Sequence, residues 1–387
     1  MHESSERLQK LPPYLFIEID RLKREARSKG HDIIDLGVGD PDLNTPEFII
    51  DELNRQARIQ INQRYALDQG IPELRQEIAR WLKMRFNIEM DSATEILPTI
   101  GSKEAIAHFP LAIINEGDLA LIPDPCYPPY KSGVLFAGGE FELMPLRAEN
   151  SFLPDLSKLS EGSLTRAKLL YLNYPNNPTS ACATKGFYED AVRIAKKYNI
   201  IICSDLAYSE MTFDGFTPLS IMQINGAKDS AIEFHSLSKT YNMTGWRIGF
   251  AYGNKELIRL LSKVKANIDS GVFQAIQYAG IRALREGAAT VEKNLAIYKQ
   301  RRDILVEGLQ SLGYELQVPQ ATFYLWIKVP RPYTSADFCM KLLREAHIVV
   351  TPGNGFGPSG EGYFRIALTI DSKRLPQVIE RMRKIKL

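Results

Sequence analysis

The sequence predicts an α/β protein with a large domain, built on a mostly parallel sheet covered by helices, and a smaller α+β domain. Three observations predict this fold. The chain has 387 residues, more than the ~250–300 at which a single hydrophobic core usually stops growing. Short apolar runs alternate with helical stretches between about residues 95 and 255, as in βαβ units. The segments outside this region mix long charged helices with a few strands, so we expect both chain ends to build the smaller domain.

The elements follow from local patterns, taken in chain order. Residues 1–30 are expected to be mostly helical, because IEIDRLKREARSKG combines good helix formers with charges and ends at Gly30. Five apolar runs predict buried strands: 119–123, 168–173, 200–204, 231–235 and 247–252. Helical stretches are predicted at 104–114, where Pro110 should kink the helix, and at 187–198. After residue 280 the pattern predicts long charged helices and strands at 323–329 and 365–368.

The same pattern gives domain boundaries. We expect residues 1–40 to form an N-terminal arm that belongs partly to the small domain. Residues 41–280 should form the large domain, and residues 281–387 the small C-terminal domain.

Composition excludes several classes of protein. The 48 basic and 46 acidic side chains give a formal net charge of +2, too small for bulk attraction to nucleic acid or an anionic membrane. No apolar run reaches the ~18–20 residues that cross a bilayer, and MHESSERLQK lacks the apolar stretch of a secretion signal. The cysteines form no C-x-x-C pair and the five histidines no metal-binding pattern. We therefore expect a cytoplasmic protein without disulfides, metal, nucleic-acid or membrane partners.

Polar and aromatic side chains follow four of the predicted strands. Asn177 lies in NYPNNPTS after the strand at 168–173, and Asp205 follows 200–204 with Tyr208 three residues on. Lys239 ends SLSKT after 231–235, and Tyr127 lies in DPCYPPY after 119–123. Ligands of open parallel sheets bind beyond the carboxyl ends of the strands. Each residue alone is commonplace, as a turn residue or a solvated charge, but the set has a shared chemistry.

That chemistry is what pyridoxal phosphate requires. The cofactor needs a lysine amine of lowered pKa, an anion facing its pyridine nitrogen, and a phosphate site with backbone N–H groups, hydroxyls and an arginine. It also needs an aromatic ring to stack on and donors for its ring oxygen. The sequence offers a candidate for each in turn: Lys239; Asp205; the Gly101-Ser102-Lys103 turn with Ser236 and Arg247; Tyr127; and Asn177 with Tyr208.

These motifs, in this order along the whole chain, resemble the fold-type I, class I and II aminotransferases, which include aspartate aminotransferase. The matching segments are LGVGDPDLNTP, Tyr65, GSKEA, DPCYPPY, NNPTS, DLAY, SLSKTYNMTGWRIG and YFRIAL. The resemblance implies that Lys239 binds the cofactor covalently, that Asp205 pairs with the pyridinium, that Tyr208 and Asn177 hold the ring oxygen and that Tyr127 stacks. It further implies a phosphate site of Gly101, Ser102, Lys103, Ser236, Ser238 and Arg247, completed by Tyr65 of a neighbouring subunit in a homodimer. Arg365 would bind the substrate α-carboxylate with a bidentate fork.

A narrower resemblance lies at the N-terminus. LPPYLFIEIDRLK followed by DLGVGDPDLNTP is similar to the LL-diaminopimelate aminotransferases of lysine biosynthesis. The resemblance implies a substrate pocket of Tyr14, Gly39, Lys103, Tyr127, Asn177 and Arg365. Asp68 and Asn267 are candidates for the distal end of the substrate. The chain departs from the wider family at Ser180, where N-P-T-G is usual, and we expect this change to leave the chemistry intact.

The expected function is transamination between two small molecules, LL-2,6-diaminopimelate and 2-oxoglutarate. The alternative is an alanine, aromatic or methionine aminotransferase, because an arginine for the α-carboxylate does not select the side chain. A transcription regulator with an aminotransferase-like sensor would need a DNA-binding module, for which residues 1–30 are too short. A nicotinamide dehydrogenase is disfavoured, since the Gly353-x-Gly355-x-Gly357 run is flanked by prolines and opens no helix after a strand. We expect that run to be a loop near the substrate carboxylate.

Overall fold

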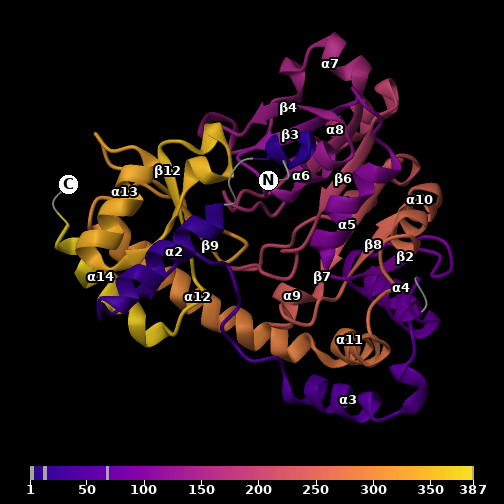
Figure 1. The fold of residues 1–387 in the computed structure, drawn as a ribbon, viewed down its shortest axis with the longest axis horizontal. Helices are drawn as coiled ribbons and strands as arrows, with labels where there is room; N and C mark the ends of the chain where they lie inside the picture. The colour runs from indigo at the N-terminus through magenta and orange to yellow at the C-terminus, as the bar shows by residue number, and fades with distance from the viewer. Residues whose placement is uncertain (1–3, 12–14, 67–68, 386–387) are drawn as a thin grey trace.

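The computed structural model describes residues 4–11, 15–66 and 69–385, which fold around one seven-stranded sheet and two smaller sheets (Figure 1). The strand order of the large sheet is β2-β8-β7-β6-β5-β3-β4. The strands span β2 Ile96–Thr99, β3 Leu119–Asp124, β4 Glu140–Pro145, β5 Ala167–Asn173, β6 Ile201–Asp205, β7 Ala231–Ser236 and β8 Gly249–Gly253. Only β8 runs antiparallel to its neighbours, and all other adjacent pairs are parallel. The mostly parallel sheet is confirmed.

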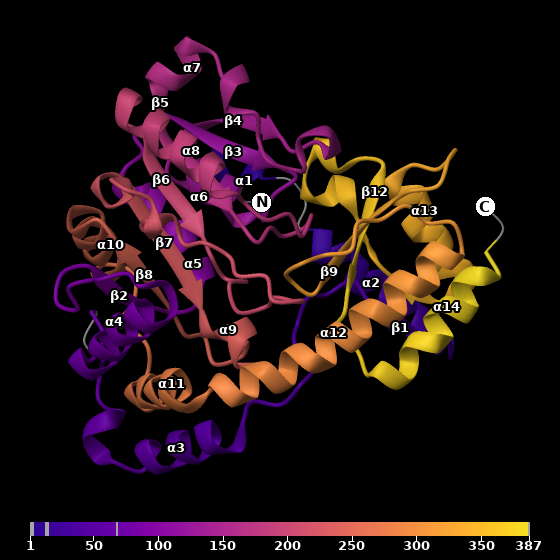
Figure 2. The same cartoon turned by 180° about the vertical axis from the view of Figure 1, so that it is seen from behind.

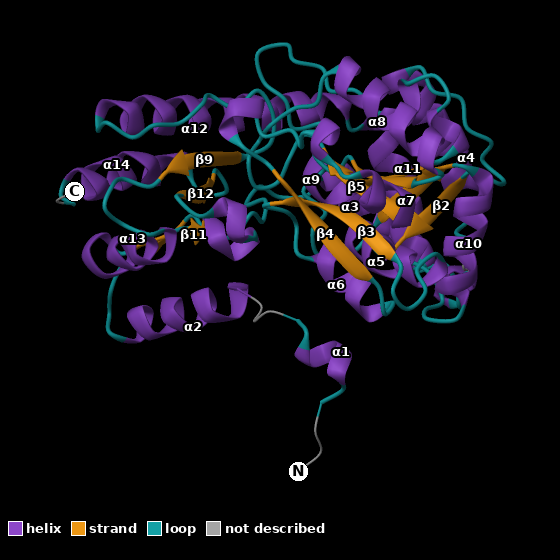
Figure 3. Cartoon of the chain, turned by 90° about the horizontal axis from the view of Figure 1, so that it is seen from above, coloured by secondary structure: helices purple, strands orange, loops and turns teal. Residues whose placement is uncertain are grey.

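Helices cover both faces of this sheet, because successive side chains of its strands point to opposite faces. Leu169 and Tyr171 of β5 pack with helices on one face, α5 (Ser102–His108), α6 (Pro129–Phe136) and α10 (Lys255–Ala266). Leu170 and Leu172 pack with α8 (Lys185–Tyr198) on the other, and Figure 3 shows α5 and α8 on opposite sides of the strands. A third cluster joins α4 (Pro72–Phe86) to α11 (Gln274–Glu286), and α3 (Glu47–Ala57) lies along α11.

The predicted strands of the large sheet all form, but two further strands went unpredicted. Strand β4 lies at the edge of the sheet, where Met144 is its one buried residue and its two ends are exposed, so its sequence EFELMP lacks the continuous apolar run of a buried strand. Strand β2 is four residues long and contains Pro98, which weakens the signal further.

The expected kink at Pro110 is instead a helix end. Helix α5 ends at His108, and Phe109–Ala112 continues as a 3₁₀ turn with proline in its first turn. A proline ring clashes with the carbonyl four residues earlier and has no N–H to donate. The tighter turn lets the chain continue past Pro110 without that α-helical hydrogen bond.

The smaller sheets gather both ends of the chain. Strand β1 (Ile34–Asp35) pairs in parallel with β10 (Ile348–Val349), and β11 (Thr351–Pro352), β12 (Tyr363–Ala367) and β9 (Tyr324–Lys328) form an antiparallel sheet. Around them lie α2 (Leu15–Ser28), α13 (Ser335–Lys341), α14 (Leu375–Arg383) and the long α12 (Ala288–Ser311), which runs from α11 toward this region (Figure 2). The chain begins with the short α1 (Glu6–Gln9) and carries α7 (Glu161–Arg166) before β5. The domain boundaries at residues 40 and 280 remain predictions.

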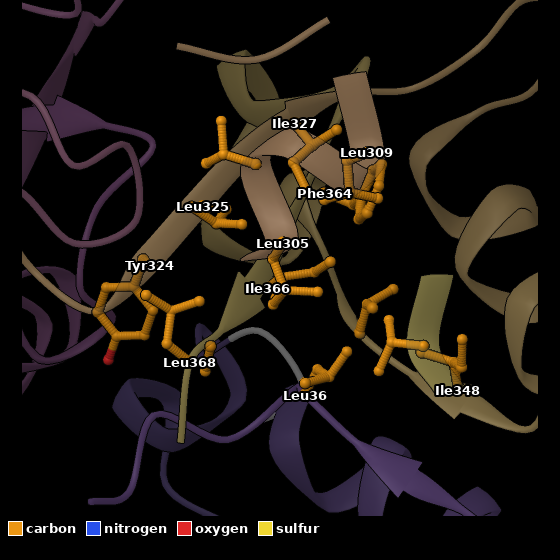
Figure 4. Packing of buried hydrophobic residues seen from close by; sticks show 14 of the residues in the cluster. Leu36, Leu305, Leu309, Tyr324, Leu325, Ile327, Ile348, Phe364, Ile366 and Leu368 are labelled. Atoms are coloured by element: carbon orange, nitrogen blue, oxygen red, sulfur yellow. The ribbon is translucent and has the colours of Figure 1, made fainter. Parts of the chain in front are cut away.

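One apolar cluster connects the small sheet to the large one. Leu305, Leu325 and Ile366 pack in its centre (Figure 4), and Tyr208, from the segment after β6, belongs to the same cluster. The carboxyl end of the large sheet therefore abuts the smaller sheet, and side chains from both reach the space between them. Within the described ranges, no helix is long and apolar enough to cross a membrane.

Candidate active site

A cavity of about 550 Å³ lies at the carboxyl ends of the parallel strands, where the large and small sheets meet. Its lining unites residues that the sequence separates by more than three hundred positions. The predicted site residues in this lining are Gly39, Ser102, Lys103, Tyr127, Asn177, Asp205, Tyr208, Ser236, Ser238, Lys239, Arg247 and Arg365. Gly101 adjoins the cavity through its contact with Arg247.

Lys239 follows strand β7 on the short helix α9 (Leu237–Thr240) and projects into the cavity. Its Nζ donates to the Gly39 carbonyl at 3.0 Å and lies 5.6 Å from the centre of the Phe323 ring. Burial lowers the pKa of this amine from 10.5 to about 8, because the cavity solvates the charged form poorly. About a tenth of the amine is therefore neutral, and nucleophilic, at pH 7.

Asp205 is the last residue of β6 and is 5% exposed. Its Oδ2 accepts a hydrogen bond from the Tyr130 hydroxyl at 2.8 Å, and its Oδ1 accepts one from the Ala207 N–H at 3.2 Å. Burial raises the pKa of this carboxyl to about 6, against the lowering effect of both bonds. Among the residues that the structure describes, no cation pairs with Asp205. A buried carboxylate of this kind fits a cationic ligand atom, such as a pyridinium nitrogen.

An anion cradle lies beside these two groups. Helix α5 begins at Ser102, directly after Gly101 at φ +72°. A Cβ at Gly101 would come 2.5 Å from Nη2 of Arg247, so the guanidinium lies against the turn that exposes the first N–H groups of the helix. Arg247 Nη1 donates to the Thr244 carbonyl at 2.8 Å, and Ser236 also lines the cavity. A cation, N–H groups and hydroxyls are the donors that a phosphate requires.

Arg365 enters the cavity from β12 and is 1% exposed. Its Nη1 donates to Asn177 Oδ1 at 2.6 Å and its Nη2 to the Gly37 carbonyl at 2.8 Å, while its Nε has no partner. No carboxylate pairs with it in the described part of the chain. A buried guanidinium held only by neutral oxygens still has N–H donors for a carboxylate ligand.

Three side chains surround the space between these charges. The Tyr127 ring meets the Tyr130 ring edge to face, with centroids 5.9 Å apart. The Tyr208 hydroxyl lies 2.8 Å from the Tyr324 hydroxyl, and Asn177 is fixed through its backbone N–H, which donates to Asn173 Oδ1 at 2.9 Å. Burial raises the pKa of Tyr208 well above its usual range, so this hydroxyl keeps its proton and can donate it to an anionic ligand oxygen.

Some predicted residues lie elsewhere. Tyr65 is 89% exposed and does not line the cavity. Asn267 follows helix α10 at the surface, where its side chain donates to the Lys263 carbonyl. Tyr14 and Asp68 fall outside the described residues. No cluster of three or more potential metal ligands occurs among the residues described.

Sequence reasoning missed part of the lining, namely Val38, Asn173, Ala207, Thr244, Tyr324 and Phe356. Phe356 belongs to the glycine-rich run at 353–357 that was expected to form a loop near the carboxylate site. Its ring centre lies 4.7 Å from Cζ of Arg365, so the loop does lie beside this arginine. Tyr324 lay within a correctly predicted strand, but alternation along a strand does not say which face borders a cavity.

Comparisons with known proteins agree with this geometry. The family model described as aminotransferase class I and II matches residues 31–382. The chain is 54% identical over 387 residues to an LL-diaminopimelate aminotransferase of Aquifex aeolicus, covering 100% of both chains, and 53% identical over 381 residues to one of Syntrophobacter fumaroxidans, covering 98% of each. The solved structure of a single mutant of Thermus thermophilus aspartate aminotransferase superposes with a TM-score of 0.93 at 29% identity, covering 99% of this chain and 100% of that one.

Proposed function

The chain belongs to the class I and II aminotransferases, and from that premise we propose that it transfers an amino group from LL-2,6-diaminopimelate to 2-oxoglutarate. As a member of this family it is a pyridoxal-phosphate enzyme. The observation that carries the choice of substrate is the identity of 54% over its full length to a relative that bears this activity in its name. A place in lysine biosynthesis, in the cytoplasm, follows from that substrate.

Three charged groups of the cavity, Asp205, Arg247 and Lys239, suit the cofactor. Pyridoxal phosphate, when bound, supplies a protonated ring that withdraws electrons from the substrate α-carbon. Asp205 holds the ring nitrogen protonated, and Tyr130 keeps this carboxylate in place with its hydroxyl. Arg247, Ser102 and the adjacent N–H groups hold the phosphate, and Lys239 is the residue to which the cofactor is attached.

Lys239 also moves the proton that transamination requires. Its neutral Nζ would take the proton from the substrate α-carbon and later give it up again, acting first as a base and then as an acid. The lowered pKa of about 8 matches this exchange near neutral pH. Its contact with the Gly39 carbonyl, at 3.0 Å, holds the amine beside the loop whose Gly37 carbonyl accepts a hydrogen bond from Arg365.

Arg365 orients both substrates by the group that they share. Every α-amino and α-oxo acid carries a carboxylate, and a guanidinium fork binds it in a planar, bidentate manner. Asn177 holds one end of the fork, with Oδ1 2.6 Å from Nη1. Because Arg365 reads only this shared group, Tyr14, Gly39, Lys103 and Tyr127 are the residues that we propose distinguish one side chain from another.

We propose further that the enzyme is a homodimer. Tyr65 is 89% exposed, and Ile61 and Phe273 nearby are 56% and 41% exposed. Ile61 lies in the turn after α3, and this turn packs against α11, which begins directly after Phe273. An apolar face of this kind suits a second copy of the chain, which would bring Tyr65 to the partner's phosphate site. Light scattering on the purified protein tests the mass, and Tyr65→Phe should weaken cofactor affinity without changing that mass.

A competition among amino donors tests the substrate. Purified, cofactor-loaded protein is given 2-oxoglutarate with an equimolar mixture of LL-diaminopimelate, alanine, phenylalanine, methionine and aspartate, and the consumption of each is followed. We expect LL-diaminopimelate to be consumed first. Preferential use of alanine, phenylalanine or methionine, with none of LL-diaminopimelate, would favour the alternative specificity. The Lys239→Ala variant serves as the control and should transfer no amino group from any donor.

A further inference from the structure

Tyr324 contacts two residues of the candidate active site, Tyr208 and Arg365, although no sequence motif includes it. It is the first residue of β9 and is 2% exposed. Its hydroxyl is 2.8 Å from that of Tyr208, and its ring centre is 4.1 Å from Cζ of Arg365. Figure 4 shows the ring at the margin of the apolar cluster of the small sheet. One side chain thus contacts both the ring-oxygen donor and the carboxylate-binding arginine.

The backbone of Gly39 packs closely against the ring and hydroxyl of Tyr324. A Cβ at Gly39 would come 2.0 Å from the Tyr324 hydroxyl and 2.6 Å from two atoms of its ring. Gly39 therefore has to be a glycine for the tyrosine to reach Tyr208. The carbonyl of the same glycine accepts the hydrogen bond from Lys239, so a displacement of the Tyr324 ring would also move a partner of the lysine.

The backbone of Tyr324 is held by the residue at which the chain departs from its family. Ser180 occupies the position of the usual glycine in N-P-T-G, at φ +62°, and is 8% exposed. Its hydroxyl donates to the Tyr324 carbonyl at 2.8 Å and lies 2.7 Å from Oγ1 of Thr322. A side chain at a left-handed φ costs free energy, and here the hydroxyl joins the loop of Asn177 to the start of β9.

We propose that Tyr324 is a positioning residue, which orients Tyr208 through its hydroxyl and Arg365 through its ring, and that Ser180 holds it in register with the Asn177 loop. This inference rests on the proposed function and on the role that the resemblance implies for Tyr208, a hydrogen bond donated to the cofactor's ring oxygen. The Tyr208 hydroxyl can donate only one proton. With that proton given to the ring oxygen, the Tyr324 hydroxyl is the donor to Tyr208, and this bond makes Tyr208 a stronger donor.

The bound cofactor itself reports the hydroxyl's effect. The negative charge on the ring oxygen is greatest when the lysine–cofactor link has lost its proton, so a donor to this oxygen stabilises the deprotonated form most. Such a donor therefore lowers the pH at which the visible absorbance of the cofactor changes. Tyr324→Phe keeps the ring and removes the hydroxyl, and should raise that pH by about half to one unit. Its KM values for donor and acceptor should change less than about threefold, because the ring over Arg365 remains.

The ring and the serine each have a distinct signature. Tyr324→Leu should raise KM for both substrates by about three- to tenfold, since it removes the aromatic face under Arg365 while filling much of the space. Ser180→Ala and Ser180→Gly both remove the hydroxyl, but only the glycine relieves the backbone. If the Ser180 hydrogen bonds hold Tyr324 in place, both variants should raise the pH midpoint of the absorbance change by the same amount. This shift should be smaller than that of Tyr324→Phe.

Tyr363→Phe is the matched control, because Tyr363 lies on the neighbouring strand β12 but stacks on Trp326 outside this cavity. It should leave the absorbance midpoint unchanged. The inference is overturned if Tyr324→Phe moves the midpoint by less than about 0.2 units, lowers it, or shifts it no more than the control does. A wild-type protein with no visible cofactor band, or a Lys239→Ala variant whose band keeps the wild-type pH-dependent shift, would instead overturn the proposed function on which the inference rests.

Discussion

Replacing Arg365 with lysine probes the carboxylate site most sharply. Lysine keeps the positive charge but loses the planar fork and the two bonds to Asn177 and Gly37, at 2.6 and 2.8 Å. A hydrogen bond to a charged group contributes about 1.5–3 kcal/mol. The substitution also removes the stacking of the guanidinium on the Tyr324 ring, which contributes about 1 kcal/mol. We expect a loss of about 2–4 kcal/mol in transition-state stabilisation, or a decrease in kcat/KM of about 30- to 1,000-fold.

The assay compares both halves of the reaction. Steady-state kcat/KM is measured for the amino donor and for 2-oxoglutarate, because both present the same carboxylate to Arg365. The two values should decrease by similar factors. Arg193→Lys, on the exposed face of α8, is the control and should change neither value. A decrease confined to one substrate, or of less than about threefold in both, would refute the assignment of Arg365.

Three further predictions follow from burial and packing. Asp205→Asn should raise the free energy of unfolding of the cofactor-free protein by up to about 3 kcal/mol at pH 8 but not at pH 4. The raised pKa of about 6 means that the wild-type protein loses stability as the pH rises and the carboxyl ionises, and asparagine avoids this loss. Equal effects of the substitution in denaturant melts at both pH values would contradict this. The rate at which the cofactor attaches to the apo-protein should rise about tenfold per pH unit up to pH 8 and then level off, as Lys239 loses its proton; a flat profile in stopped-flow absorbance would rule out this lysine as the limiting nucleophile. Gly249→Ala should destabilise by about 2 kcal/mol or more, because its Cβ would lie 2.6 Å from the His235 carbonyl, whereas Gly186→Ala, with open space around it, should be neutral or stabilising in thermal melts.

The parallel strands of the large sheet and the charged residues of the cavity could be predicted from the sequence, because both have strong local sequence patterns. Buried parallel strands appear as continuous apolar runs, and the residues that follow them must gather at one edge of the sheet. Asp205 and Lys239 were placed in this way and line one cavity. The edge strand β4 and the helix end before Pro110 have weaker local signals, and both were missed.

Side-chain contacts between the large and the small sheet could not be predicted from local sequence patterns. Tyr324 and Tyr208 are separated by 116 positions, and their hydroxyls meet because β9 packs at the carboxyl end of β6. Ser180 was recognised as a departure from the family, but its bond to the Tyr324 carbonyl depends on the same packing. Such pairs become visible only when the fold places them together.

Reduction and peptide mapping of the purified protein show which lysine holds the cofactor. The purified protein is treated with borohydride, which makes a lysine–cofactor link permanent, and is then digested and analysed by mass spectrometry. We predict that the cofactor mass appears on the peptide containing SLSKTYNMTGWR and that fragmentation assigns it to Lys239. Attachment to another lysine, or an unmodified Lys239 in a protein saturated with pyridoxal phosphate, would show that Lys239 does not bind the cofactor covalently.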